Sequence, residues 1–131
     1  MIVVDASVVA DLLLRTAKAP AIESLLFASD AGSLHAPSLL DVEVAHVLRR
    51  HALERELSPS RGNEAIRDLL DLRIQRHAHD LLIGRVWELR SAMTAYDACY
   101  VSLAELLDAP LLTLDRKLAR SRGHAAEVRL L

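Results

Sequence analysis

Short apolar runs alternate with longer amphipathic stretches along the chain. Residues 2–4 form a β-branched run that predicts a buried strand. Weaker runs at 34–36 and 72–75, a strong one at 110–114 and a last one at 128–131 predict further strands. Apolar residues at helical spacing predict helices between them, over residues 7–14, 19–30, 38–54, 58–72, 80–91, 96–108 and 115–122.

Helix starts are marked by proline and small polar residues. Ser58 precedes Pro59, which is a cap followed by proline at the first helical position. Ser38 is expected to cap the helix that follows it, with Asp41 in the positive first turn. Because strands alternate with helices, we expect parallel strand pairing and an open α/β sandwich, in which ligands bind beyond the carboxyl ends of the strands.

Composition limits the class of protein. The 131 residues include 18 acids and 16 bases and are 52% hydrophobic, which predicts one ordered domain spanning residues 1–131. A single cysteine, Cys99, excludes an internal disulfide and a cysteine-rich zinc site. No apolar run is long enough to span a bilayer and the start does not resemble a signal peptide, so we expect a cytoplasmic protein. The net charge of −2 lacks the basic excess expected of a nucleic-acid binder, and the 3% aromatic content argues against a base-stacking platform.

Two acids terminate apolar strands. Asp5 follows the first predicted strand and Asp115 follows the strand at 110–114. If both strands are parallel in one sheet, the two carboxylates lie at the same edge. Each acid also precedes a helix, so helix capping explains either one alone.

Two further acids lie in apolar helical segments. Asp97 precedes a segment that is nearly apolar all round, where a carboxylate without a partner is costly, although a cap in the first helical turn is an alternative. Glu43 and Asp41 lie at opposite borders of an apolar stripe, and periodicity does not choose between them. Since Asp41 has a capping role and Glu43 has none, Glu43 is the functional candidate by elimination.

Carboxylates gathered at one edge would repel each other without a counter-charge. A hard divalent cation such as Mg²⁺, or Mn²⁺, supplies that charge through oxygen ligands. Zinc is disfavoured because the six histidines are scattered along the sequence, and each is explained as a surface or packing residue.

The same residues carry a family resemblance across the whole chain. Residues 3–7 (VVDAS) resemble the opening of PIN-domain ribonucleases, and Glu43 lies mid-helix after a Pro-Ser start, like that family's second acid. Residues 94–98 (TAYDA) and 113–118 (TLDRKL) resemble the segments of the third and fourth acids. PIN domains of this size are most often VapC toxins of VapBC toxin–antitoxin pairs.

The resemblance implies a fold, an activity and partners. The fold is an α/β/α sandwich around a mostly parallel five-stranded sheet. The activity is metal-dependent endoribonuclease cleavage of RNA phosphodiester bonds by a metal-activated water. A cognate VapB-like antitoxin neutralises it, and the toxin forms a homodimer without membrane association.

The resemblance also implies residue roles. Asp5, Glu43, Asp97 and Asp115 would form the catalytic acidic pocket, in which Asp5, Asp97 and Asp115 hold one or two Mg²⁺ or Mn²⁺ ions. Ser7 and Thr113 occupy positions where the family has small polar residues beside the acids. Candidate RNA-phosphate contacts are Arg116, Lys117, Arg120, Arg122, Arg15 and Lys18, which are equally explained as solvated helix faces.

Three alternative functions differ in what they require. An aspartate-nucleophile phosphatase would need a second acid at position 7, which is Ser7. A phospho-accepting receiver domain would need paired acids after the first strand and an acceptor aspartate after the third. A module that binds RNA or protein without cutting is separated from a nuclease by metal-dependent cleavage.

Overall fold

In the computed structural model, which describes residues 1–131, five strands form one sheet in the order β3-β2-β1-β4-β5. All four strand pairs are parallel, which confirms the predicted α/β fold. The order reverses at β1, so the crevice expected at a topological switch point lies between β1 and β4. The strands are β1 (Ile2–Val4), β2 (Leu34–Pro37), β3 (Ile74–His77), β4 (Leu111–Thr113) and β5 (Val128–Leu130).

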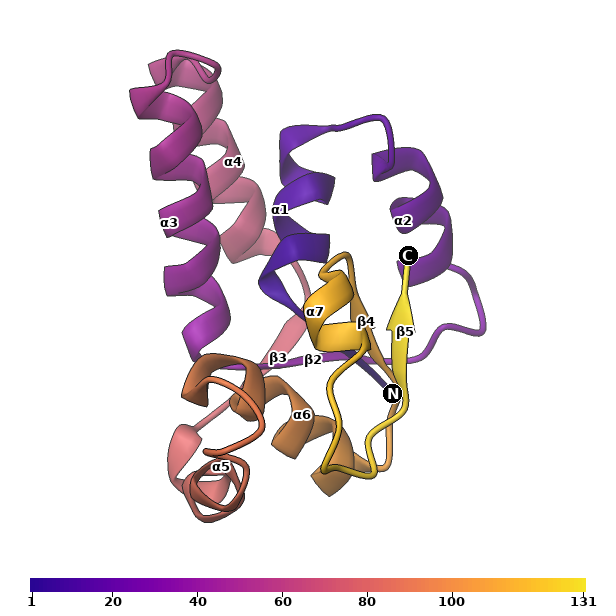
Figure 1. Ribbon diagram of the computed structural model, residues 1–131. Helices are drawn as coiled ribbons and strands as arrows, with labels where there is room; N and C mark the ends of the chain where they lie inside the picture. Colours follow the sequence, from indigo (N-terminus) through magenta and orange to yellow (C-terminus); the bar gives the residue numbers. More distant parts are fainter.

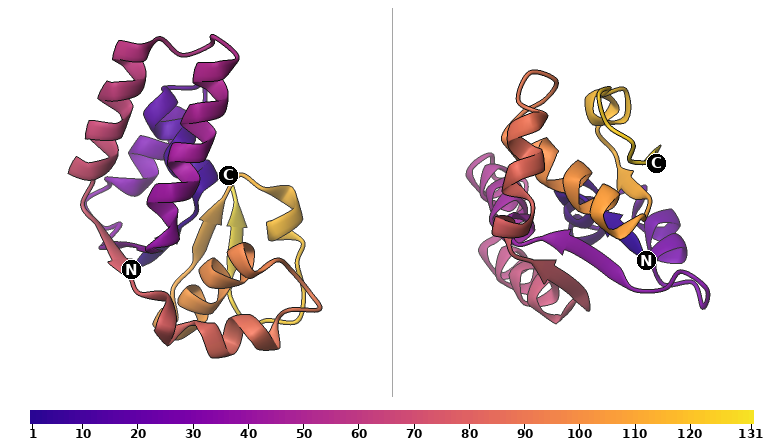
Figure 2. Two further views of the ribbon diagram at one scale, coloured as in Figure 1. Left: turned by 90° about the vertical axis from the view of Figure 1, so that its left-hand side faces the viewer. Right: turned by 90° about the horizontal axis from the view of Figure 1, so that it is seen from below.

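Helices cover both faces of the sheet. Figures 1 and 2 show α1 to α4 on one side, with α3 and α4 as an antiparallel hairpin that extends beyond the sheet, and α5 and α6 on the other side. Helix α6 contacts β1, β2 and β4, so it lies directly beneath the switch point. The helices are α1 (Ala6–Leu14), α2 (Ala19–Leu26), α3 (Leu39–Leu53), α4 (Pro59–Asp71), α5 (Ile83–Glu88), α6 (Ala95–Leu107) and α7 (Arg116–Ala119), with a 3₁₀ turn η1 (His79–Leu81).

The core explains why the central elements are apolar. Val3 and Val4 of β1 are fully buried, as expected for a parallel strand covered on both faces. In α6, every residue from 98 to 104 is buried, which confirms the prediction of a buried helix. Because α6 is enclosed along this stretch, a charged residue at its start lies at the border of the core.

Several predicted boundaries are wrong for local reasons. The helix expected over 19–30 ends at Leu26, because the chain turns at Gly32 (φ 77°) to place β2 beside β1. The strand expected at 72–75 lies at Ile74–His77, since Leu72 ends helix α4. The helix expected over 80–91 is divided into η1 and α5, and the one expected over 115–122 covers only Arg116–Ala119.

The predicted cap at Ser38 is wrong. Ser38 has helical backbone angles, and its hydroxyl donates to the His77 carbonyl (3.0 Å) rather than capping α3. The Leu39 N–H donates instead to Nε2 of His79 (2.9 Å), so a histidine from a distant segment accepts the first free amide of the helix.

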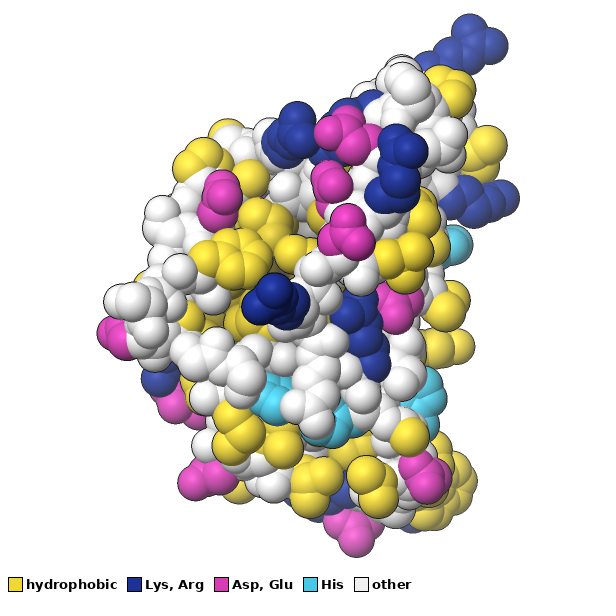
Figure 3. All heavy atoms as spheres, turned by 180° about the vertical axis from the view of Figure 1, so that it is seen from behind, with side chains coloured by type: hydrophobic (Ala, Val, Ile, Leu, Met, Phe, Trp, Pro, Cys, Tyr) yellow, Lys and Arg dark blue, Asp and Glu magenta, His cyan; other side chains and the backbone are white.

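Two histidines that lie far apart in the sequence meet in the structure. Nδ1 of His35 lies 2.9 Å from Nε2 of His77, and Nε2 of His35 lies 2.7 Å from the Ser33 hydroxyl. Seen from behind, histidine side chains gather across the middle of one face (Figure 3). The ring centroids of His35 and His77 are 5.2 Å apart, which fits an in-line N–H···N hydrogen bond.

Candidate active site at the carboxyl edge of the sheet

Asp5 ends β1 and begins α1, and it is only 5% exposed. One carboxylate oxygen, Oδ1, accepts bonds from the Ser7 N–H (3.0 Å), the Ser7 hydroxyl (2.5 Å) and the Val8 N–H (3.2 Å). The other, Oδ2, accepts from the Thr113 hydroxyl (2.5 Å). The capping explanation is therefore correct, and the same side chain is a buried acid at the switch point.

Two hydroxyls join the ends of β1 and β4. The Ser7 hydroxyl accepts from the Leu114 N–H (2.9 Å) while it donates to Asp5. The Thr113 hydroxyl accepts from the Asp115 N–H (2.9 Å) while it donates to Asp5. Since each hydroxyl bridges the two segments, Ser7 and Thr113 fix the position of Asp5 relative to Asp115.

Glu43 reaches the same region from α3. Its Oε2 accepts a bond from the hydroxyl of Tyr100 (2.9 Å), whose ring is 2% exposed on α6. Asp41, the other acid on this helix, pairs with Arg76 (2.9 Å). The structure therefore separates the two acids that the helical wheel did not.

Tyr100 is a residue that sequence reasoning did not assign to the site. Its hydroxyl bond to Glu43 makes it a positioning residue of the site. A signal was available, because Tyr100 shares a helical face with Asp97 in a segment that is otherwise apolar. A buried tyrosine hydroxyl requires a polar partner, and the acids are the polar groups nearby.

Asp97 lies in the first turn of α6 but does not cap it. Thr94 is the cap, and its side chain accepts from the Asp97 N–H (3.2 Å). The half-buried Asp97 carboxylate forms no ion pair with a basic side chain, and its hydrogen bond with the Thr94 side chain lowers its pKa without capping the helix. The capping alternative is thereby wrong for this residue, and its carboxylate is left available.

Asp115 is exposed and caps the short helix α7. Its Oδ1 accepts from the Lys117 N–H (2.7 Å) and the Leu118 N–H (3.4 Å). Capping therefore accounts for Asp115 structurally, while the strand end places it beside Asp97.

The electrostatics of the edge are unfavourable for ionised acids. Burial raises the pKa of Asp5, although the hydrogen bonds from Ser7 and Thr113 oppose this shift. Burial also raises the pKa of Glu43, and the negative charges of Asp5 and Asp97 raise it further. The pKa of Asp97 is raised by burial and then by Asp115, while the hydrogen bond with Thr94 and the charge of Lys117 lower it. Each of the four predicted acids thus lies near at least one other: the pKa of Glu43 is affected by Asp5 and Asp97, and that of Asp97 by Asp115.

The donor set fits a hard divalent cation. All four acids offer carboxylate oxygens, and the repulsion among them would be relieved by positive charge. No three Asp, Glu, His or Cys side chains are close enough to form a complete metal cage. Mg²⁺ does not require such a cage, because it usually binds through one or two carboxylates and keeps several waters.

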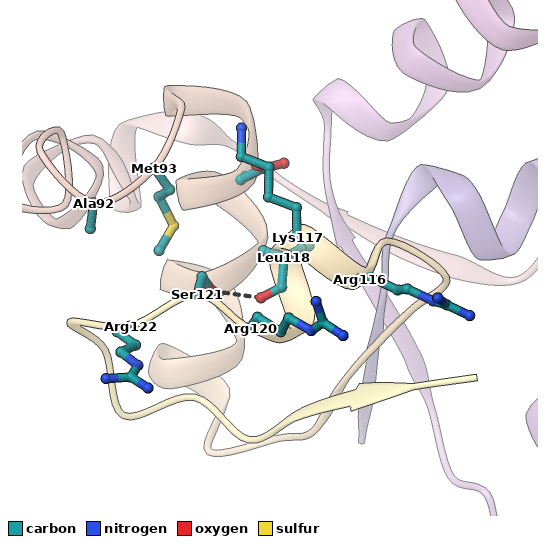
Figure 4. A pocket seen from close by; sticks show the side chains of 9 residues that line it. Ala92, Met93, Arg116, Lys117, Leu118, Arg120, Ser121 and Arg122 are labelled. Atoms are coloured by element: carbon teal, nitrogen blue, oxygen red, sulfur yellow. Dashed lines mark hydrogen bonds between the residues drawn. The ribbon is translucent and has the colours of Figure 1, made fainter.

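A basic cavity adjoins the acids. It has a volume of about 520 Å³, and α7 and the loop that follows supply most of its charged lining. Figure 4 shows that the basic side chains fan out from α7 and this loop rather than converging on one point. The lining residues are Asp97, Ala92, Met93, Arg116, Lys117, Leu118, Arg120, Ser121 and Arg122.

Arg15 and Lys18 do not join this cavity. Arg15 ends α1, at the opposite end of the helix from Asp5, and pairs with Glu64 (3.1 Å). Lys18 donates to the Leu131 carbonyl (3.1 Å). The structure therefore separates these two bases from the four at positions 116 to 122.

Comparisons with known proteins agree with this geometry. The PIN domain family matches residues 2–123. The ribonuclease VapC1 of Mycobacterium tuberculosis is 43% identical over 130 residues, with 98% of this chain and 96% of that protein covered. The ribonuclease VapC12 of the same organism is 37% identical, with 99% and 98% covered.

Solved structures share the fold at lower identity. M. tuberculosis VapC20, described as a sarcin-ricin loop cleaving toxin, aligns with a TM-score of 0.66 at 16% identity, covering 91% of this chain and 93% of that one. VapBC2 from Rickettsia felis, bound to a DNA fragment from its promoter, aligns with a TM-score of 0.66 at 15% identity, covering 98% of both chains.

A parallel sheet with acids gathered at its switch point, together with the match over residues 2–123, defines the class: the chain belongs to the PIN-domain family. Its full-length similarity to VapC1 and VapC12 places it among the VapC ribonucleases of that family. No helix in the structure combines the length and apolar character needed to cross a membrane.

Proposed function

We propose that the protein is a metal-dependent endoribonuclease toxin whose catalytic acids are Asp5, Glu43, Asp97 and Asp115. The observation that carries the proposal is that Asp97 lies half-buried at the carboxyl edge, where its charge meets those of Glu43 and Asp115. A charged group in that state is costly to the fold unless it binds something. Similarity to VapC ribonucleases supports RNA as the substrate.

Asp5, Asp97 and Asp115 would hold one or two Mg²⁺ or Mn²⁺ ions. When bound, such an ion supplies Lewis-acid polarisation of the phosphodiester and lowers the pKa of a water. The chain's own residues set the geometry. Ser7 and Thr113 hold Asp5 against the end of β4, and Tyr100 holds Glu43. Hydrolysis would leave a 5′-phosphate and a 3′-hydroxyl.

The basic cavity would hold the RNA backbone. Arg116, Lys117 and Arg120 come from or follow directly on α7, whose cap is Asp115, so the bases begin where the acids end. Because their charged ends diverge in Figure 4, they suit successive phosphates of a strand better than one anion. Phosphate contacts position the strand without reading its sequence.

Cleavage of total RNA in Mg²⁺ or Mn²⁺, with and without chelator, tests the activity after any bound antitoxin has been stripped. We expect chelator-sensitive products from the wild-type protein. Asp97→Asn should lower the rate at least about a hundredfold, because it removes a charge that acts on the reaction. Asp41→Asn, on the Arg76 side of α3, is the matched control and should keep its activity.

Two outcomes contradict the proposal. If wild-type protein binds RNA but gives no chelator-sensitive products, the protein is a binding module. If Asp97→Asn cuts as fast as wild type, the acid assignment is wrong. Asp97 is a better test than Asp5, because Asp5 accepts four hydrogen bonds that an asparagine would not fully replace.

RNA binding by the basic cavity has its own test. Replacing Arg116 and Lys117 with Ala should weaken binding to the Asp97→Asn protein and flatten its salt dependence, by a slope of about one for each phosphate that is no longer neutralised. Replacing Arg67 and Arg73, exposed bases on and after α4, with Ala is the control. An unchanged salt slope in the first variant contradicts the assignment.

The partner would be a VapB-like antitoxin, bound at a cavity of about 430 Å³ between α1, α2 and α4, where charged as well as apolar residues line the wall. Leu12, Leu13, Phe27 and Leu72 line it, and Phe27 is 53% exposed. On α3, Val44 and Leu48 belong to the core and do not line this cavity. Phe27→Glu should abolish co-purification with the antitoxin and leave cleavage intact.

The isolated toxin is expected to be a homodimer. Light scattering of the purified protein checks this directly. A mass of one protomer contradicts it.

A further inference from the structure

A second cavity borders the acids and shares no lining residue with the basic one. It has a volume of about 650 Å³ and is mainly apolar. Its two most exposed apolar side chains are Val42 on α3, 73% exposed, and Tyr96 on α6, 65% exposed. The lining residues are Ala6, Leu39, Val42, Glu43, His46, Val47 and Tyr96.

This cavity is continuous with the acidic cluster. Glu43 belongs to both, Ala6 follows Asp5 directly, and Tyr96 precedes Asp97 directly. The basic cavity meets the same cluster at Asp97. The acids therefore adjoin both a cationic cavity and an apolar cavity with an exposed aromatic ring.

An RNA strand has the same alternation of chemistry. Each phosphate is charged, and each base is a flat apolar ring with polar edges. Protein aromatic rings bind unpaired bases by stacking, and the polar edges are then met by side-chain donors and acceptors. In this cavity Tyr96 supplies a ring, Val42 and Val47 supply apolar walls, and His46 and Glu43 supply polar groups.

We propose that this cavity is a nucleobase subsite: an unpaired base next to the cleaved bond stacks on Tyr96 while the strand on the other side of the bond runs through the basic cavity. The inference rests on the proposed endoribonuclease function and adds a specificity-determining residue to it. The subsite places one base, and selects the bond that is cut by requiring that base to be unpaired. A protein occupant is disfavoured because the cavity ends at the acids, where Glu43 is part of its wall.

A double-perturbation cycle tests the stacking contact. The substrate is a short RNA spanning a bond that the wild-type protein cuts in total RNA, with an abasic nucleotide substituted in turn at each position beside that bond. Tyr96→Ala should lower kcat/KM about tenfold on the intact RNA, as expected for the loss of one stacked base. Removing the base at one position should cause a similar loss, and the two together should cause little more than either alone.

Two variants make the effect specific. Tyr96→Phe keeps the ring and should retain kcat/KM within about twofold. Trp87→Ala removes an aromatic ring that is equally exposed, at 68%, but lies on α5 outside the cavity, and should leave kcat/KM unchanged. Tyr96 makes no side-chain hydrogen bond that its loss would break, so Tyr96→Ala is expected to fold.

The outcomes separate the subsite from the activity. In one outcome, the wild-type protein cuts RNA in a chelator-sensitive way while the losses of kcat/KM from Tyr96→Ala and from base removal multiply independently at every position. That result contradicts the subsite and leaves the proposed nuclease activity intact. If those two effects are independent and light scattering shows that Tyr96→Ala is a monomer while the wild-type protein is a dimer, the cavity is an interface between copies. Absence of any metal-dependent cleavage overturns both proposals.

Discussion

Acidic side chains occur in two contrasting settings in this molecule. On the α5–α6 side, Glu105 receives two bonds from Arg85 (2.8 and 3.0 Å) and one from the Ala125 N–H (2.8 Å), and its pKa is lowered chiefly by the Arg85 bond. At the carboxyl edge, the pKa of Asp97 is raised by burial and by the charge of Asp115. The same type of group stabilises the fold in one place and destabilises it in the other.

The contrast is visible within a single helix. On α3, Asp41 pairs with Arg76, while Glu43, two residues on, faces other acids and a tyrosine hydroxyl. Acids that serve stability are given cations by the fold. Acids that face one another repel each other, and a bound cation would relieve that repulsion. For this reason, side chains with shifted pKa values gather at functional sites.

Binding of Mg²⁺ should give the largest change in stability. At about 100 times its Kd, a ligand adds about 2.7 kcal/mol to the free energy of unfolding. We expect saturating Mg²⁺ to raise the Tm of wild-type protein by several degrees and to leave Asp97→Asn nearly unchanged. Thermal unfolding followed by circular dichroism, with chelator as reference, measures this. An equal rise in both proteins would mean that the ion binds elsewhere, and Glu105→Gln is the control that should respond like wild type.

Loss of the Tyr100 hydroxyl should have the next largest effect. Tyr100→Phe keeps the buried ring but leaves Glu43 without its bond, so cleavage should fall roughly tenfold, as for other residues that orient a ligand of the reacting centre. The Mg²⁺ concentration needed for half-maximal rate should rise, which a purely structural role would not cause. Unchanged metal dependence together with a lower Tm would contradict the positioning role.

The fold was largely predictable because its signals are local. The Ile2–Val4 run, the apolar strand before Asp115 and the apolar stretch of α6 each report burial through hydrophobicity alone, and strand–helix alternation then requires parallel pairing. The ends of elements were less predictable. Ser38 resembles a helix cap in the sequence, but it is His79 that accepts the first free N–H of α3. His79 comes from another segment, which only the fold brings to this position.

The site shows the same division. Asp5 and Asp115 were identifiable because strand ends meet at one edge, and Asp97 because a charge in an apolar helix is anomalous. The choice of Glu43 over Asp41 rested on elimination, because what separates them is Arg76 on β3 and Tyr100 on α6. Such long-range partners leave no periodic signal in the sequence.

Neutralising one acid from each setting should shift stability in opposite directions. Without metal, Glu43→Gln should raise the Tm by a few degrees, because it removes repulsion from Asp5 and Asp97 while Gln still accepts from Tyr100. Glu105→Gln should lower the Tm, because Arg85 loses the less exposed of its two ionic partners and keeps only Glu88. Melts in chelator at low salt measure both, and shifts of the same sign would show that the two settings do not differ.

The smallest effect is the pH dependence of the Glu105 contribution. The pKa of Glu105 in the folded protein lies below its usual value of 4.5, because Arg85 and the Ala125 N–H favour the ionised form. The carboxylate therefore adds stability above about pH 4.5, and that stability is lost as pH falls through the lowered pKa. The stability gap, which is the difference in unfolding free energy between wild type and Glu105→Gln, should be constant near neutral pH and should close on acidification.

Glu127→Gln is the matched comparison, since Arg129 also lowers the pKa of Glu127, but this pair is exposed and screened by solvent. Its gap should be smaller and should disappear on adding salt at neutral pH, whereas the Glu105 gap should persist. A gap for Glu105 that widens on acidification would mean that its carboxylate opposes folding, as the acids at the carboxyl edge do.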